Sequence, residues 1–206
     1  MDRVRIRPAG ESALLVECVD GERAAAWRDE LWRRRTADQL SATEIVPGAR
    51  TVLLDGLPDP AATARLIAGW APPPAADRAV TEVLEIPVRY DGVDLADVAD
   101  RWGVPVRTAV ERLANAELSV AFCGFAPGFG YLAGLPPEWA VPRLPSPRPR
   151  VPAGSVGLAA GYAGIYPTAS PGGWRLVGRT EATLFDVRRD PPALLTPGTS
   201  VRLAAT

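Results

Sequence analysis

The segment FAPGFGYLAGLPPEW (Phe125–Trp139) concentrates glycine, proline and aromatic residues, and SPGGWRLVGRT (Ser170–Thr180) repeats the combination. Each contains a Pro-Gly pair, which is typical of a type II turn because proline fixes φ at the second position and glycine supplies a positive φ at the third. The remaining glycines and aromatics have two interpretations. They form either the corners of a β-barrel, where glycine lets strands bend, or the walls of a binding cleft.

Short apolar or alternating runs surround these two segments, namely SVAFCGF, SVGLAAGYAGIYP, WRLVGRT, ATLFDV and SVRLAA, each bounded by proline or glycine. Many short strands with frequent turn signals predict a β-barrel or a β-sandwich. Before them, EVLEIPVRY predicts a strand, and residues 94–117 predict two short helices divided at Gly103, with Pro105 at the first position of the second helix. The second half is therefore predicted to be mainly β.

The first half has a different pattern. RVRIRPAGESALLVEC predicts two strands that turn at Ala9-Gly10, and GERAAAWRDELWRRR (Gly21–Arg35) predicts a helix. TEIVPGARTVLLDGL predicts strand, turn and strand, followed by a helix that opens at Asp59-Pro60. This order predicts an α+β domain with an antiparallel sheet. The proline-rich run WAPPPAADRA (Trp70–Ala79) separates the halves, so we expect a small α/β domain at residues 1–76 and a barrel domain at residues 77–206.

Two absences restrict the chemistry. The chain has no histidine, and all 23 basic residues are arginine. A Ser-His-Asp triad, a Cys-His pair, an imidazole metal ligand and a lysine Schiff base are therefore excluded, and an anion must be held by arginine or by backbone N–H groups. Cys18 and Cys123 lie far apart, so free thiols and no metal site are expected.

Charge and hydropathy give further expectations. The net charge of −1 does not favour nucleic acid or an anionic membrane as a partner. No apolar run approaches the ~20 residues of a membrane span, and MDRVRIRPAG lacks the apolar stretch of a secretory signal. We expect a cytoplasmic protein.

A group of arginines suggests a binding site. Arg143, Arg148 and Arg150 lie in the proline-stiffened segment VPRLPSPRPRVPAGS. They are either surface residues that aid solubility or a preorganised site for an anion, since a guanidinium binds a carboxylate with two hydrogen bonds. Ser155 in PAGSVG does not match the nucleophile motif G-x-S-x-G, because alanine occupies the first position, and is interpreted as a hydrogen-bond donor or turn residue. The aspartates at 91, 94 and 97 are interpreted as loop and helix-start residues.

Taken in order, GFAPGFGYLAGLP, PRLPSPR, VPAGSVG, GIYP, SPGGW, GRT and PGTSVRL resemble the carboxyltransferase-domain family, subdomains C and D. This family includes the B subunit of 5-oxoprolinase, allophanate hydrolase subunit 1 and the sporulation-kinase inhibitor KipI. The resemblance implies a cyclophilin-like β-barrel after a small α/β domain. It also implies a complex with a second carboxyltransferase-domain protein, the C subunit, and with an A subunit of the LamB/YcsF type. Such a complex opens 5-oxo-L-proline to L-glutamate at the expense of ATP, without metal ligands in this chain.

The resemblance also implies which residues line a binding cleft, but it identifies no catalytic residue. Its motifs cover Phe125, Pro127 and Gly128 in the first turn. Tyr131, Tyr166 and Trp174 would line the cleft, Arg143, Arg148 and Arg179 would bind a carboxylate or phosphate, and Ser155 would donate a hydrogen bond. One departure is LANAELSV, where Ala114 and Leu118 occupy places at which family members often have histidine and tyrosine.

Two other functions stay open at this point. A KipI-like protein would inhibit a sensor histidine kinase through protein contact, and would have no effect on 5-oxoproline turnover. A component of a urea or allophanate amidohydrolase system would be encoded beside an amidase. The 5-oxoprolinase component is the leading prediction.

Overall fold

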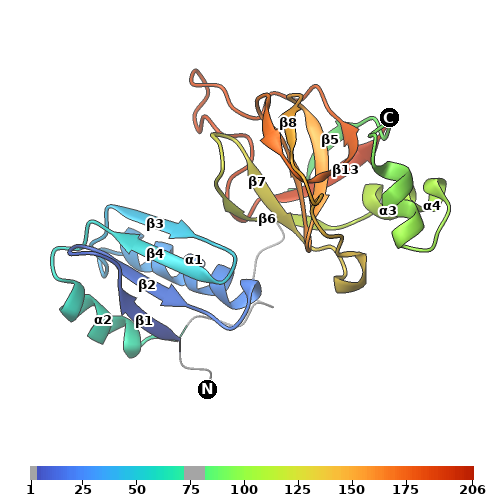
Figure 1. Ribbon diagram of the computed structural model, residues 1–206. Coiled ribbons are helices and arrows are strands. Elements are labelled where there is room, and N and C mark those ends of the chain that lie inside the picture. The colour runs from blue at the N-terminus through green and yellow to red at the C-terminus, as the bar shows by residue number, and fades with distance from the viewer. Residues whose placement is uncertain (1–3, 72–81) are drawn as a thin grey trace. The chain divides into compact units, whose positions relative to one another are not determined.

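The computed structural model describes residues 4–71 and 82–206 (Figure 1). The chain divides into two compact units, Met1–Val80 and Thr81–Thr206. The boundary predicted at residues 76 and 77 lies outside the described residues, so that part of the domain prediction stays a prediction. Among the residues described, no helix combines the length and the apolar character needed to cross a bilayer.

The first unit is an antiparallel sheet with strand order β1-β2-β4-β3 and two helices, as the sequence predicted. The elements are β1 (Arg5–Pro8), β2 (Leu14–Glu17), α1 (Gly21–Thr36), β3 (Glu44–Pro47), β4 (Thr51–Asp55) and α2 (Pro60–Ala68). Both helices begin at an aspartate whose side chain accepts a backbone N–H: Asp20 from Arg23, and Asp59 from Ala62. Such caps satisfy N–H groups that the first helical turn leaves unpaired.

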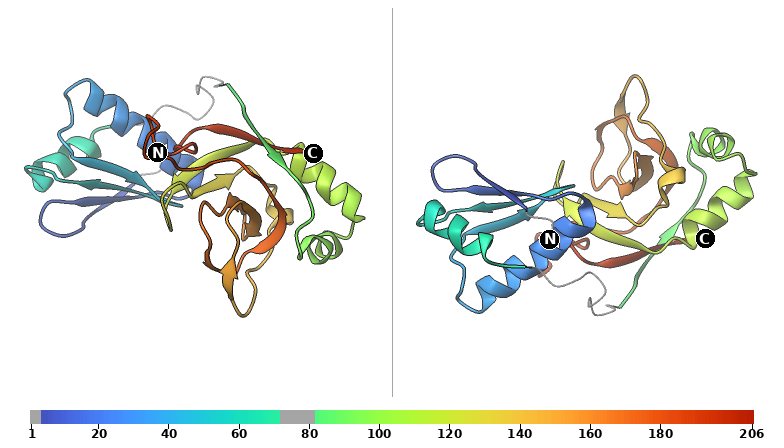
Figure 2. Two further views of the ribbon diagram at one scale, coloured as in Figure 1. Left: turned by 90° about the horizontal axis from the view of Figure 1, so that it is seen from above. Right: turned by 90° about the horizontal axis from the view of Figure 1, so that it is seen from below.

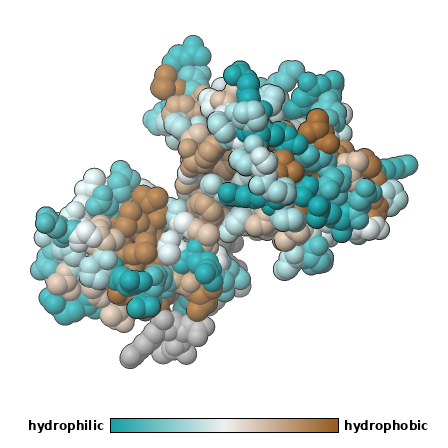
Figure 3. Space-filling view, in the orientation of Figure 1, coloured by the Kyte–Doolittle hydropathy of each residue, from teal (hydrophilic) through white to brown (hydrophobic). Residues whose placement is uncertain are grey.

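The alternation of the strands decides which face of this sheet is covered. Leu14 and Val16 of β2 and Val52 and Leu54 of β4 are buried with Trp27, Leu31 and Ile67 of the helices. The other face has a cross-strand row in which Arg7, Leu15, Leu53 and Val46 are successive neighbours. Figure 3 shows the apolar surface that gathers over β3 and β4. One face of the sheet is therefore buried in the core of the unit, and the other face has apolar side chains in the middle of this cross-strand row.

Cys18 follows β2 and packs against this core. Burial raises the pKa of its thiol from 9.0 to about 11, with Arg23 acting in the opposite direction and Asp20 in the same direction. In the unfolded chain the thiol loses its proton near pH 9, and in the folded chain only near pH 11. Between these values the unfolded state binds fewer protons than the folded state.

We therefore expect the free energy of unfolding to fall as the pH rises from 9 to 11. The fall assigned to Cys18 is at most about 1.4 kcal/mol per pH unit, the limit for one proton. Urea titrations at successive pH values measure it. Cys18→Ala is expected to flatten this slope, and an equal slope in the variant would show that other groups cause it.

The second unit is a seven-stranded mixed sheet in the order β12-β9-β10-β7-β6-β13-β5, with β11 and β8 forming a separate pair. The strands are β5 (Leu84–Val88), β6 (Leu118–Cys123), β7 (Gly130–Ala133), β8 (Arg148–Val151), β9 (Ser155–Ala159), β10 (Tyr162–Ile165), β11 (Ser170–Gly172), β12 (Arg175–Arg179) and β13 (Ser200–Ala205). Only β13 and β5 pair in parallel within this set of described strands. Just beyond β5, Arg89 and the β12 residue Arg179 exchange two backbone hydrogen bonds of 2.9 Å. The sheet is therefore a nearly closed barrel, which decides between the predicted barrel and sandwich.

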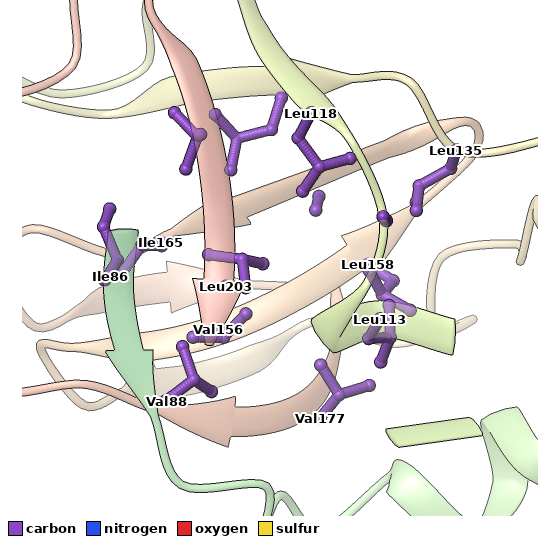
Figure 4. Packing of buried hydrophobic residues seen from close by; sticks show 14 of the residues in the cluster. Ile86, Val88, Leu113, Leu118, Leu135, Val156, Leu158, Ile165, Val177 and Leu203 are labelled. Atoms are coloured by element: carbon purple, nitrogen blue, oxygen red, sulfur yellow. The ribbon is translucent and has the colours of Figure 1, made fainter. Parts of the chain in front are cut away.

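Apolar side chains from all around this sheet meet in one core (Figure 4). Val156 and Leu158 of β9 lie there with Ile86 of β5 and Leu203 of β13, and each is at most 1% exposed. Helices α3 (Leu95–Arg101) and α4 (Val106–Ala114) pack on each other and against β12 and β13, and η2 (Pro137–Trp139) is a short 3-10 turn. Figure 2 shows α3 and α4 side by side on the outer side of the sheet.

Two local predictions were wrong. Pro105 does not occupy the first helical position, because its ψ of 150° is extended and α4 begins at Val106. The run ATLFDV forms no strand and has only an isolated bridge between Phe185 and Ala193. There the chain turns back after Val187, and Arg189 N–H donates to the Asp186 carbonyl. The returning segment contains Pro191 and Pro192, which have no N–H to donate to a ladder.

Candidate functional site

The turn after β6 places the first aromatic residues of the site. Phe129 N–H donates to the Ala126 carbonyl at 3.0 Å, and Gly128 has φ = +85°, which confirms the predicted type II turn. Phe125, just before the turn, has φ = +68° and is 60% exposed. A positive φ is strained for a bulky residue, and such strain is concentrated at functional sites. The turn holds the Phe125 ring edge-on to Phe129 and Tyr166.

The second Pro-Gly segment is not a turn of this kind. Ser170–Gly172 form β11, which pairs with β8, and Gly172 does not have a positive φ. Glycine is required here for a different reason: a Cβ at position 172 would lie 2.3 Å from the Tyr166 hydroxyl oxygen. The Tyr166 ring packs against the backbone of β11 at Gly172, so no side chain fits at position 172.

These segments enclose a pocket of about 230 Å³. It is lined by Phe125, Phe129, Tyr131, Arg143, Pro147, Tyr166, Pro171, Gly172, Gly173 and Trp174. The Phe129 ring lies at the centre of the aromatic set, with centroids 5.0 Å from Tyr131, 5.4 Å from Trp174 and 5.5 Å from Tyr166. Edge-to-face contacts at these distances favour a rigid arrangement. The walls are thus preformed and mostly apolar.

Arg143 is the one residue with a permanent charge in this lining, all of which the structure describes. None of the described contacts gives its guanidinium an ion pair. It acts on the neighbouring phenol: burial raises the pKa of Tyr166, and the backbone of Trp174 and the charges of Arg143 and Arg148 oppose that rise. The pocket therefore presents one cation beside a neutral phenol.

This arrangement has the composition of a ligand pocket. Ligand pockets in proteins are commonly apolar, with a few polar groups that orient the ligand. The aromatic rings can cover the faces of a small ring, and a guanidinium can hold a carboxylate. The lining contains no carboxylate or thiol that could act as a base, and no described group of residues could hold a metal ion.

Of the ten residues predicted for the site, five line this pocket: Phe125, Tyr131, Arg143, Tyr166 and Trp174. Pro127 and Gly128 lie in the turn that follows Phe125 in the chain, and Ser155 is buried in β9. The anion-binding role expected for three arginines stays a prediction, and two of the three pair with carboxylates of this chain. Arg148 pairs with Asp94 at 2.7 Å and Arg179 with Asp91 at 2.8 Å, so each meets a carboxylate of its own chain.

The remaining lining residues had no predicted role. Phe129, Pro147 and Gly172 stand within the quoted motifs, so a signal for them was present. The aspartates near α3 were interpreted as loop and helix-start residues; Asp94 is the N-cap, but its side chain makes no capping hydrogen bond with the helix. Ala114 and Leu118 do not line the pocket, and Leu118 is buried in the barrel core.

Comparison with known proteins gives consistent matches. Residues 4–195 match the family model for "Carboxyltransferase domain, subdomain C and D". A protein of Escherichia coli O157:H7, named as the B subunit of 5-oxoprolinase, is 40% identical over an alignment of 211 positions, and the match covers 98% of this chain and 96% of that protein.

Solved structures share the fold. The crystal structure of TTHA0988 has a TM-score of 0.76 and 33% identity over 98% of this chain, which spans 40% of the length of TTHA0988. The urea carboxylase of Kluyveromyces lactis has a TM-score of 0.69 at 22% identity, and this chain spans 22% of its length. At that identity the likeness concerns the fold alone.

Proposed function

Because the chain belongs to the carboxyltransferase-domain family, subdomains C and D, we propose that it acts as the B subunit of an ATP-dependent 5-oxoprolinase. The observation that carries this proposal is the 40% identity to the B subunit of Escherichia coli 5-oxoprolinase over nearly the whole of both chains. The complex would open 5-oxo-L-proline to L-glutamate. The barrel would be of the cyclophilin-like kind.

The pocket supports this substrate. 5-Oxoproline is a five-membered lactam that carries a carboxylate, so it has two apolar ring faces and one anionic group. Tyr131, Tyr166 and Trp174 would cover the ring, and Arg143 would hold the carboxylate with two hydrogen bonds. The Tyr166 phenol is protonated at neutral pH, since burial raises its pKa further above the ordinary value of 10, so it can donate a hydrogen bond to an oxygen of the lactam.

Binding alone does not open a lactam, because amide resonance protects its carbonyl from water. ATP, which the complex uses, would supply a leaving group on the carbonyl oxygen. The residues of this chain would orient the ring and exclude water from it, and the charge of Arg143 would stabilise negative charge that develops nearby. No ATP contact is assigned to this chain.

Partner proteins complete the proposal. The Escherichia coli relative is named as one subunit among several, which supports a complex of different chains. The 40% share of TTHA0988 that this chain spans supports a further component joined to the same fold. We assign that component to a second carboxyltransferase-domain protein, the C subunit, and expect an A subunit of the LamB/YcsF type as the third. The catalytic groups would come from these partners in the cytoplasm.

Reconstitution tests this function. The chain is purified with its genomically adjacent A and C subunits, and ATP-dependent glutamate release from 5-oxoproline is measured with each protein omitted in turn. Activity that requires all three is expected, and it would also show that the histidine replaced at Ala114 is dispensable. A stable complex without turnover of 5-oxoproline, but with turnover of urea or allophanate, would refute the proposal. Tight binding of a sensor histidine kinase, with no effect on turnover, would refute it as well.

A further inference from the structure

Two aspartates at the start of α3 are linked to the pocket lining through arginines, although neither lines the pocket itself. Asp94 is only 9% exposed. Its Oδ1 accepts a hydrogen bond from Arg148 Nη2 at 2.7 Å, and its Oδ2 accepts one from the backbone N–H of Leu176 at 2.6 Å. The backbone N–H of Asp94 donates back to the Leu176 carbonyl at 2.9 Å. Asp94 is therefore fixed to β12 just before its bulge, where the register shifts between Leu176 and Gly178.

Arg148 extends this contact to the pocket wall. Its Nη1 lies 3.4 Å from the carbonyl oxygen of Trp174, while its Nη2 binds Asp94. Trp174 directly precedes β12, and its ring forms part of the pocket. One planar guanidinium thus joins the aspartate to the main chain of an aromatic wall residue.

A second pair repeats the arrangement one helical turn later. Arg175, which is 5% exposed, donates from Nη1 to Asp97 and from Nε to the Pro142 carbonyl at 3.0 Å. Pro142 directly precedes Arg143, the cation of the pocket. Asp97 also accepts from Arg101 at 3.0 Å. Asp94 and Asp97 are three residues apart, so they lie on one face of the helix start.

The charges of these pairs also matter. Arg175 is buried, where an arginine without a partner is costly, and Arg148 is partly buried; each guanidinium has a carboxylate within hydrogen-bond distance. Their two positive charges are therefore balanced, and Arg143 keeps its role as the unpaired cation of the lining. The same pairs hold the backbone at Trp174 and at Pro142, in segments more than thirty residues apart.

We propose that Asp94 and Arg148 are positioning residues that fix Trp174 in the pocket, and that Asp97 and Arg175 do the same for Arg143. This rests on the proposed function, because the pocket is taken as the lactam site. It changes the role of Arg148: this residue acts on the ligand through Trp174 and does not bind it directly. A loss of the Arg148 contact shifts the Trp174 ring and weakens binding without removing a ligand contact.

Arg148→Lys tests the proposal most sharply. Lysine keeps the charge opposite Asp94, but it cannot reach both partners with a planar fork. The full chain is labelled with fluorotryptophan, and the ¹⁹F resonance of Trp174 is assigned among the six tryptophans by its absence in Trp174→Phe. We expect the Trp174 resonance to move while the other five stay in place. The Kd for 5-oxoproline should rise about fivefold, the size of one lost hydrogen bond.

Two further variants make the result decisive. Asp94→Asn is expected to move the same resonance, and Glu111→Gln, which breaks an exposed ion pair with Arg107 on α4, should move none. An unchanged Trp174 resonance and an unchanged Kd in Arg148→Lys would overturn the proposal, whether or not Asp94→Asn folds. If the wild-type chain and its complex do not bind 5-oxoproline while the resonance still moves, the proposed function fails and the positioning role stands.

Discussion

Replacing Arg143 by glutamine is expected to lower the kcat/KM of the reconstituted complex for 5-oxoproline about thirtyfold or more, or ~2 kcal/mol of lost stabilisation. Arg143 is the one charged residue of the pocket lining, and none of its described contacts is an ion pair, so no other lining side chain can take over the carboxylate. The glutamine amide can donate hydrogen bonds, but it has no charge, and charge-assisted hydrogen bonds are roughly twice as strong as neutral ones. ATP-dependent glutamate release, followed at several substrate concentrations, measures the effect.

A control lies seven residues away in the same segment. Arg150 is also exposed, but it does not line the pocket, so Arg150→Gln is expected to leave kcat/KM unchanged. Arg143→Lys should recover part of the lost activity, since lysine keeps the charge without the planar pair of donors. Equal activities in Arg143→Gln and Arg150→Gln would remove Arg143 from the substrate site.

Gly172→Ala is expected to close the pocket and destabilise the barrel. The new methyl group would lie 2.3 Å from the Tyr166 hydroxyl oxygen and 2.8 Å from Cζ of the same ring. Tyr166 is 2% exposed and packs edge-on against Phe129, so its ring cannot move without disturbing the aromatic set. Overpacking of this kind costs about 1–3 kcal/mol, and we expect the free energy of unfolding to fall by that amount. Activity of the complex should fall more than about tenfold, because Tyr166 is displaced into the pocket.

The adjacent glycine provides the comparison. A Cβ at Gly173 would meet its nearest neighbour, Cβ of Pro147, at 3.6 Å, an ordinary contact distance. Gly173→Ala is therefore expected to leave the free energy of unfolding within about 0.5 kcal/mol of the wild-type value. Urea denaturation of both variants measures the difference. Equal stabilities would show that the Tyr166 ring yields to the methyl group, and would contradict the rigid aromatic set.

Local patterns in the sequence predicted most elements of the fold, because each depended on residues close to one another. Asp59-Pro60 opens α2 as expected, and Ala126-Pro127-Gly128-Phe129 forms the expected turn. The type II turn predicted for the second Pro-Gly pair, Pro171-Gly172, is absent. There a long-range constraint decided the backbone, since β11 pairs with β8 and lies against Tyr166. A Pro-Gly pair gives the conformations that are allowed, and the tertiary packing selects among them.

The aromatic residues predicted for the site lie together around the pocket, whereas the arginines predicted with them lie apart, and only Arg143 of the three lines it. Tyr131, Tyr166 and Trp174 could be grouped because their motifs stand out in composition. The roles of the arginines depend on aspartates more than fifty residues away, such as Asp94 opposite Arg148 and Asp91 opposite Arg179. One sequence contains no signal for such pairings. The cluster of arginines therefore indicated a positively charged segment, but not which of its arginines pair with aspartates.

The closure of the barrel has a consequence for its motions. Next to β5, the sheet closes onto β12 through the two backbone hydrogen bonds between Arg89 and Arg179. Further along β12, the Gly92 N–H donates to the Val177 carbonyl, and Asp94 hydrogen-bonds with Leu176. This seam has fewer regular hydrogen bonds than a full strand pair, so its backbone amides are expected to exchange with deuterium faster than those of β9 and β10. Because Asp94 also binds Arg148, which contacts Trp174, a ligand that packs against Trp174 should slow exchange at this seam. Amide exchange at this seam would then report whether the pocket is occupied.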